Sequence, residues 1–408
     1  MAPGSSQGLG VLPSTPPPWL ETVPEALLAV DGLPDRVDVA IVGGGLAGLS
    51  AARFLALGGA SVAVVEARPQ LGGGFATRAP GLVLASLGEH PGRLVGSVGL
   101  AAARQMHAFL AESRAIVDGL GLLVRTGSLS VGAMPGEGEE IAASQELLTS
   151  MGVPCQGWSA REVAAHLGSV GLDGGRFVPE DGVVDPVALV LRLARDARAA
   201  GAHLAPGRAV TTLDERAGSW QIRGPGLELS AAAVVLAAGA GLRELVPFFR
   251  STVYAVRHQW IATGPLPPGS APPLPVLGQQ GFSHWLGVGD RLVAGGARFA
   301  TVEMEAGQDD DGVIEPRVDH ALRANLARFF PQAAAAPIPH AWSAIAAHTC
   351  DGLPLIGPLP GQPQLVACTG FHALDHSLAP GAGQAVAQGL ITGRAQGVPR
   401  LFMPTRLV

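Results

Sequence analysis

The pattern of apolar residues near the N-terminus predicts a strand, a glycine turn, a helix and a second strand. Val37–Val42 is a short apolar run typical of a buried strand, and Leu46–Leu57 has the apolar periodicity of a helix. Ser61–Glu66 is a second apolar run of strand length. This order is typical of a βαβ unit in a parallel sheet.

Further along the chain, the pattern predicts two more helices, over Ala101–Leu120 and over Pro186–Ala200. Short β-like runs separated by glycine, proline and aspartate extend from Tyr254 to Phe299 and favour an antiparallel sheet. Two apolar strands, residues 234–236 and 365–367, are each followed by a glycine turn. We expect both of them to join the parallel sheet.

The turn between the first strand and its helix carries a GxGxxG motif in the context of dinucleotide-binding folds. Gly43 permits the tight turn, Gly45 leaves no Cβ between backbone and pyrophosphate, and Gly48 lets the helix pack on the strand. The backbone amides of Leu46 and Ala47 would face the phosphates at the helix N-terminus. The motif therefore predicts a dinucleotide site but does not separate FAD from NAD.

Glu66 ends the second strand, 18 residues beyond Gly48. A carboxylate at this place accepts hydrogen bonds from ribose hydroxyls. It would repel a 2′-phosphate, which disfavours NADP.

Composition excludes several classes of function. The 408 residues are 48% hydrophobic and 15% charged, enough for a large core in two domains or one elaborated domain. A net charge of −6 without a Lys/Arg run argues against nucleic acid as a partner. The most apolar run, Ala231–Leu242, is shorter than the about 20 residues of a membrane span. No secretory signal precedes Arg36, so we expect a cytoplasmic protein.

The three cysteines are scattered and have no metal-ligand spacing, so no metal is expected. Nothing in the sequence indicates the oligomeric state.

Four segments in order resemble the FAD-dependent D-amino-acid oxidase superfamily, particularly its glycine oxidase and sarcosine oxidase branch. They are the Gly-rich stretch 67–81, the segment 182–204, the second glycine turn 233–241, and the C-terminal stretch 349–381. The resemblance implies FAD as the cofactor. It also implies contacts with the cofactor by Arg68, Gly74, Ala76, Thr77, Arg78, Val210, Ala238, Gly239, Gly370, Ala373 and Ser377.

With the resemblance, we expect an α/β fold that has a Rossmann-like FAD-binding domain, discontinuous in sequence, and a second α+β substrate domain built on an antiparallel sheet. The FAD-binding domain is expected to comprise residues 37–93, 184–246 and 341–408. The substrate domain would comprise residues 94–183 and 247–340. Residues 1–36 are expected to form a Pro-rich leader, which Trp19 and Leu20 would attach to the body.

The chain departs from the family where relatives hold the substrate carboxylate and the flavin. Ala346 and Ala373 occupy the places of the two family arginines, and Ser377 occupies that of a family lysine. Ala344 stands near the place of a covalent flavin cysteine, and Arg78 stands where some relatives tether FAD through histidine. We therefore expect non-covalent FAD and a substrate that is less anionic than a free amino acid or is held differently.

Two groups of residues are candidates for the missing contacts. Tyr254, Arg257 and Arg298 lie on predicted strands of the substrate sheet, where either arginine could bind an anion or form a structural salt bridge. The turn containing His372, Asp375 and His376 could orient an amine or accept its proton, or these groups could instead bond to backbone or flavin carbonyls. The weaker pocket candidates are His258, His284, Trp285 and His348.

The resemblance implies hydride transfer to flavin from a carbon that bears nitrogen, which converts an amine or an N-substituted amino-acid derivative to an imine. We expect a small-molecule amine substrate, with O2 or an electron acceptor reoxidising the flavin. Two alternatives remain open: oxidation of a hydroxy compound or biosynthetic intermediate, and a catalytically degenerate flavoprotein subunit.

Overall fold

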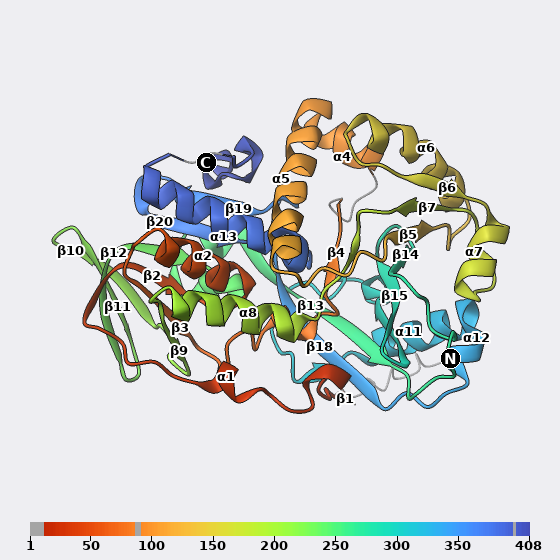
Figure 1. Cartoon of the computed structure of the whole chain (residues 1–408), viewed down its shortest axis with the longest axis horizontal. Helices are drawn as coiled ribbons and strands as arrows, with labels where there is room; N and C mark the ends of the chain where they lie inside the picture. The colour runs from red at the N-terminus through yellow and green to blue at the C-terminus, as the bar shows by residue number, and fades with distance from the viewer. Residues whose placement is uncertain (1–11, 86–90, 395–396) are drawn as a thin grey trace, which may run out of the picture.

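Two eight-stranded sheets and two short two-stranded sheets organise the part of the chain that the structure describes, residues 12–85, 91–394 and 397–408. The computed structural model is drawn in Figure 1, with the first sheet and its helices on the left and the second sheet on the right. The long strands β13 and β18 run between the two halves. This arrangement confirms the expected α/β fold class.

The first sheet has the order β10-β11-β12-β2-β3-β9, with β20 beside the end of β12 and β19 beside β20. Val234 pairs with Leu365 in a parallel register, so the two glycine-terminated strands predicted from the sequence do join this sheet. Its strands are β2 (Arg36–Val42), β3 (Val62–Glu66), β9 (His203–Pro206), β10 (Thr212–Arg216), β11 (Ser219–Gly224), β12 (Leu227–Leu236), β19 (Leu355–Leu359) and β20 (Gln362–Thr369).

Both faces of the parallel strands are buried. Val39 and Ile41 of β2 pack against helices, whereas Ala40 and Val42 belong to a separate core on the opposite face. This explains the continuous apolar run, since an alternating pattern needs one solvated face. Helix α2 (Leu46–Leu57) packs on both α8 (Pro186–Ala199) and α13 (Asp375–Thr392), and α5 (Leu100–Gly119) packs on α13.

The second sheet has the order β18-β13-β16-β15-β14-β5-β7-β6 and is antiparallel except for the β14–β5 pair. Helix α11 (Pro316–Phe329) packs on one of its faces, where alternate strand residues such as Trp285 meet Phe329. Its strands are β5 (Ser128–Val131), β6 (Gln156–Trp158), β7 (Gly175–Val178), β13 (Val253–Ala262), β14 (Val276–Gly278), β15 (Ser283–Val288), β16 (Arg291–Gly296) and β18 (His340–Thr349).

The expected domain limits stay a prediction, and strand β18 lies where two of the expected domains meet. β18 pairs along its whole length with β13 in the second sheet, although residues 341–408 were assigned to the first domain. Sequence periodicity cannot show which sheet a strand joins, because its residues are apolar in either place. The remaining helices and strands are α1 (Glu25–Leu28), α3 (Phe75–Arg78), α4 (Pro91–Val98), α6 (Glu137–Ser150), α7 (Ala160–Leu167), α9 (Leu242–Leu245), α10 (Phe249–Thr252), α12 (Pro331–Ala334), β1 (Leu12–Pro13), β4 (Leu82–Val83), β8 (Gly182–Val183) and β17 (Val313–Ile314).

The N-terminal leader is attached to the body, as its tryptophan suggested. The Trp19 indole N–H donates to the Thr77 carbonyl at 2.7 Å, and its ring meets Trp342 edge to face. Strand β1 pairs with β17. Among the described residues, no helix combines the length and the apolar character needed to cross a membrane.

Candidate functional site

A cleft of about 800 Å³ opens where strands β2, β3, β12 and β20 end. Gly43 has a φ of +111°, and a Cβ on Gly48 would lie 1.9 Å from the Gly43 carbonyl oxygen. A Cβ on Gly45 would meet nothing within 4 Å. The turn thus packs tightly beneath the helix and leaves the start of α2 open to the cleft, where Leu46 and Ala47 also contribute to the wall.

Glu66 lines the same cleft, and its carboxylate is already tied to the backbone. One oxygen accepts from the Gly44 N–H at 2.7 Å and the other from the Arg68 N–H at 2.8 Å. Burial raises the pKa of this carboxyl, while the backbone hydrogen bonds act in the opposite direction. Because a carboxylate can accept about four hydrogen bonds, Glu66 retains lone pairs for ribose hydroxyls.

The other residues expected around the cofactor divide into two sets. Those that line the cleft are Arg68, Gly74, Ala76, Val210, Ala238, Gly239 and Gly370. Thr77, Arg78 and Ser377 do not line it: Thr77 donates to the Gly72 carbonyl, Arg78 pairs with Asp311, and the Ser377 hydroxyl accepts from the Leu84 N–H. Ala373 lines a second cavity instead.

The first cleft fits FAD. It combines the N-terminus of a 12-residue helix that has no side-chain cap, a glycine backbone that a ligand can approach, and a carboxylate at the end of the next strand. Those are the groups that a pyrophosphate and a ribose require.

A second cavity of about 480 Å³ adjoins the first. Phe371 lines both of them, and the turn that follows it contributes His372 and Ala373 to the second cavity alone. β18 likewise crosses from one to the other, since Ala346 lines the cleft and His348 lines the cavity. A molecule in the second cavity would therefore adjoin a cofactor in the first.

Three imidazoles form a hydrogen-bonded array in this cavity. His258 Nε2 lies 3.1 Å from His348 Nε2, and His348 Nδ1 lies 3.1 Å from His372 Nδ1. The Thr349 backbone N–H donates to His372 Nε2 at 3.1 Å. A backbone N–H can only donate, so His372 must carry its proton on Nδ1. It follows that His348 is protonated on Nε2 and His258 on Nδ1.

The imidazoles of the cavity are neutral near pH 7. Burial, followed by the charge of Arg298, lowers the pKa of His258 well below its usual value. Burial lowers the pKa of His348 to about 2 and that of His372 to about 4. His284, which accepts a hydrogen bond from the Trp260 indole at 2.8 Å, has its pKa lowered by burial to about 4. The array is therefore uncharged, and the Nδ1–H of His258 is the one N–H of the three rings that is not used within it.

Arg298 is the cation beside this array. Its guanidinium donates to the Met304 carbonyl at 2.8 Å, and among the described residues no carboxylate lies within 4 Å of it. Burial lowers its pKa, while Tyr254 and Glu305 act in the opposite direction. An arginine remains charged in proteins, so the cavity presents a cation that lacks a counterion.

Comparison with known proteins decides the family. The model for FAD dependent oxidoreductases matches residues 38–389. The chain belongs to this family. The protein therefore shares its cofactor, FAD, as the glycine turn and the cleft had indicated.

Individual members are similar over most of the chain. Glycine oxidase from Geobacillus kaustophilus is 27% identical over 368 residues, which cover 86% of this chain and 92% of that enzyme. Its crystal structure superposes with a TM-score of 0.76 at 24% identity, covering 92% and 100% of the two chains, which establishes a common fold.

Two longer relatives match as well. The tRNA 5-methylaminomethyl-2-thiouridine biosynthesis bifunctional protein MnmC of Chromobacterium violaceum is 28% identical over 366 residues, covering 88% of this chain and 53% of the relative. The 4-methylaminobutanoate oxidase (formaldehyde-forming) of Paenarthrobacter nicotinovorans is 25% identical over 380 residues, covering 89% and 44%. The chain thus spans about half the length of these two curated relatives.

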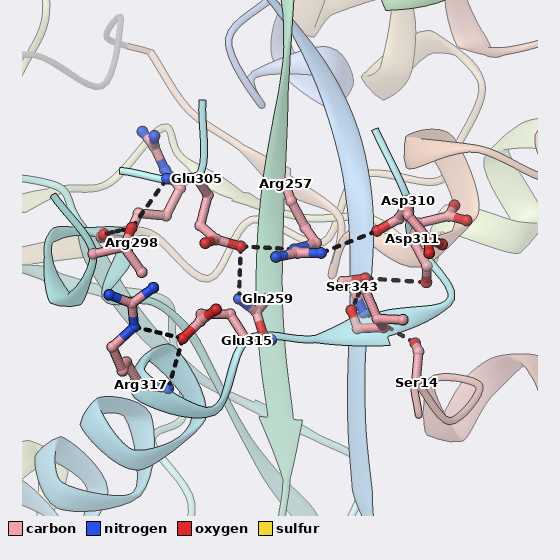
Figure 2. Close-up of polar contacts among 12 residues, drawn as sticks. Ser14, Arg257, Gln259, Arg298, Glu305, Asp310, Asp311, Glu315, Arg317 and Ser343 are labelled. Carbon is pink, nitrogen blue, oxygen red and sulfur yellow. Dashed lines mark hydrogen bonds and ion pairs between the residues drawn. The ribbon is translucent and has the colours of Figure 1, made fainter. Parts of the chain in front are cut away.

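Arg257 does not reach the cavity. Figure 2 shows Arg257 and Gln259 of β13 in a polar cluster with Glu305. Because strand residues alternate between faces, His258 lies on the opposite face from these two side chains. The Arg257 Nε lies 2.6 Å from a Glu305 oxygen, and both side chains are 4% exposed. The structural salt bridge, one of the two roles considered for Arg257, is the one observed.

The three candidates from the C-terminal turn lie in different places. The His376 imidazole is buried against the Ala76 carbonyl at 3.0 Å and lines neither cavity, so of the two roles considered for it, the bond to a backbone carbonyl is the one observed. Asp375 begins α13 and lines the FAD cleft, where burial raises its pKa to about 7. Only His372 of the three, together with Tyr254 and Arg298, reaches the second cavity.

Four cavity residues have a weak signal or none in the sequence. His258, His284 and His348 are only weak candidates there, although the even, four-residue spacing of Tyr254 and His258 on one strand places them on one face. Arg176 lines the cavity from β7 and had no motif or neighbouring pattern that could have indicated it.

Proposed function

We propose that this protein uses FAD to oxidise a C–N bond of a small amine that also carries an anionic group. The observation that carries the proposal is the second cavity, which adjoins the FAD cleft and contains the Arg298 cation and three neutral imidazoles. The named activities of glycine oxidase and 4-methylaminobutanoate oxidase, both acting on amino-acid-type amines, support a substrate of this class.

Arg298 replaces the contacts that are lost at positions 346 and 373. Ala346 lines the cofactor cleft and Ala373 lines the cavity, so neither position supplies a cation. A half-buried guanidinium without a counterion is stabilised by an oxyanion, which it can hold with two parallel hydrogen bonds. The Nδ1–H of His258 is a further donor.

The electrostatics of the cavity also favour the reactive form of the substrate. Bound FAD accepts the hydride from the carbon that carries the nitrogen. An ammonium has no lone pair to assist hydride loss, and a cation in a buried site disfavours a second positive charge. Arg298 thus lowers the pKa of the bound amine while holding the anionic end. The His258 Nδ1–H, which the array does not use internally, would orient the substrate by donating a hydrogen bond.

We propose further that the FAD is non-covalent. Ala344 has no nucleophile, and the Arg78 guanidinium is committed to Asp311. Acid precipitation should therefore release all of the flavin into the supernatant.

The experiment is anaerobic titration of the yellow holoprotein against N-methyl amino acids, primary amino acids, uncharged amines and hydroxy acids. Bleaching by amines that carry a carboxylate, with imine or aldehyde products and recolouring by O2 or an added electron acceptor, is the expected result. If only hydroxy acids bleach the flavin, the protein oxidises a C–O bond and the proposed C–N oxidation is wrong. If dithionite reduces the bound flavin but none of the titrated compounds bleaches it, the protein would be a catalytically degenerate subunit.

A further inference from the structure

The second cavity extends across most of the second sheet. Its floor follows one row of cross-strand partners: Arg176 pairs with Ser130, Ser130 with Leu277, and Leu277 with His284. The row continues from His284 to Gly295 and from Gly295 to Trp260, two residues from His258 on β13. Partners in register lie on the same face of a sheet, so these positions share the cavity side.

The length of the row exceeds that of a simple amino acid. From β7 to β13 there are five steps between neighbouring strands, in the order β7, β5, β14, β15, β16 and β13. At about 4.8 Å per step, the ends of the row lie about 24 Å apart along the sheet. Even after long side chains reach inward from both ends, the cavity has room for an extended ligand.

Arg176 closes the end of the cavity that is far from the flavin. The residue is only 6% exposed. Its guanidinium donates to the Ser144 hydroxyl and, at 3.3 Å, to the Ser130 hydroxyl, while its Nε has no hydrogen-bond partner. Among the described residues no carboxylate lies within 4 Å of it, and burial lowers its pKa.

Two acidic groups near Arg176 have other hydrogen-bond partners. The Asp181 carboxylate accepts from the Ala85 N–H and from the Ser128 hydroxyl, both at 2.6 Å. The Glu137 carboxylate, which also lines this end, accepts from backbone N–H groups of residues 133, 134 and 280. Within the described part of the chain, Arg176 therefore keeps a buried positive charge without an ion-pair partner, and such a charge is costly.

We propose that Arg176, with Ser130, binds a second oxyanion of the substrate, so that the substrate is an elongated amine with an anionic group at each end. This inference rests on the proposed function, which places the oxidised amine and its first anionic group at the end of the cavity near the flavin. Arg298 would hold the anionic group beside the oxidised C–N bond, and Arg176 would hold a terminal carboxylate or phosphate.

The test uses the FAD-loaded protein and ligands that cannot be oxidised. Thioethers of the form carboxymethyl–S–alkyl replace the amine by sulfur and are made in increasing length, each with a terminal methyl, carboxylate or phosphonate. Dissociation constants come from calorimetry and from the change in the flavin spectrum. Arg176→Gln is the variant, and Arg161→Gln, which removes the same charge from an exposed position on α7, is the matched control.

At the best spacer length, a terminal oxyanion should improve binding to the unmodified protein about tenfold or more over the methyl compound. Arg176→Gln should abolish this preference, and Arg161→Gln should retain it. The carboxylate and phosphonate series show which oxyanion fits better.

The comparison within the unmodified protein requires no variant, so misfolding of Arg176→Gln cannot leave the proposal undecided. Equal affinities for charged and methyl ends at every length would overturn it, as would a preference that survives Arg176→Gln. If the preference is found but no amine bleaches the flavin, the distal site stands and the proposed oxidation fails. If short amines bleach the flavin and no preference exists, the oxidation stands and the distal site fails.

Discussion

The proton positions and the lowered pKa values of the three imidazoles give a prediction that can be tested without knowing the substrate. The perturbation is acidification from pH 8 to pH 5.5. The pKa of His372 is about 4, so about 3% of this ring would be charged at pH 5.5, against about 90% of an imidazole with the ordinary value of 6.5. The difference of 2.5 pKa units corresponds to about 3 kcal/mol for charging His372 in the folded protein. His348, with a pKa of about 2, should stay neutral throughout.

The assay is nitrogen-15 spectroscopy of the histidine rings in the holoprotein, with signals assigned through single His→Asn variants at positions 258, 348 and 372. We expect protons on Nδ1 of His372, on Nε2 of His348 and on Nδ1 of His258, unchanged between these pH values. A ring of the three that titrates between about pH 6 and 7 would refute the burial argument. A proton on Nε2 of His372 would refute the donor role of the Thr349 N–H.

The same neutral rings make stability depend on pH. The unfolded chain binds protons below about pH 6.5 and the folded array does not, so the free energy of unfolding falls as the pH decreases from about 7 to 4. For a ring such as His372 the loss at pH 5 is about 2 kcal/mol. Denaturant unfolding at both pH values should show the fall, and a flat profile would contradict the lowered pKa values.

Three substitutions test the assignments made above. Arg298→Gln should raise the dissociation constant of an anionic substrate about 10- to 100-fold, because a charge-assisted hydrogen bond is lost, while thermal stability stays level or rises; unchanged affinity would exclude it as the anchor. Arg257→Met should lower the free energy of unfolding by about 3–5 kcal/mol, since Glu305 is left buried and unpaired, and adding Glu305→Met should restore much of it in denaturant titrations. Gly48→Ala would force a Cβ to within 1.9 Å of the Gly43 carbonyl, so purified protein should contain little flavin by absorbance; normal FAD content would show that the turn can relax.

The FAD-binding unit could be predicted because its determinants are local. The glycines at 43, 45 and 48 and the carboxylate at 66 follow one another within a single βαβ unit, where turn, helix and strand fix their relative places. Periodicity likewise predicted α8 within one residue at its end, with Asp185 accepting from two backbone N–H groups as its cap. Backbone sterics and hydrogen bonding act at short range, so the sequence is sufficient for these features.

The substrate cavity was decided by tertiary structure. The sequence could not show that Arg257 would pair with Glu305, 48 residues away, or that His376 would turn to the Ala76 carbonyl, 300 residues away. Neither contact has a short-range signature. The face of the sheet on which each side chain lies decides which of these similar residues line the cavity.

What the sequence by itself determined is the family, the cofactor and the absence of arginine at positions 346 and 373. What only the fold decided is the replacement: Arg298, the array of His258, His348 and His372, and Arg176 come from three strands, one turn and one short helix. They meet because strand register places them along one face, and register is set by pairing across the whole sheet rather than by neighbours in the chain.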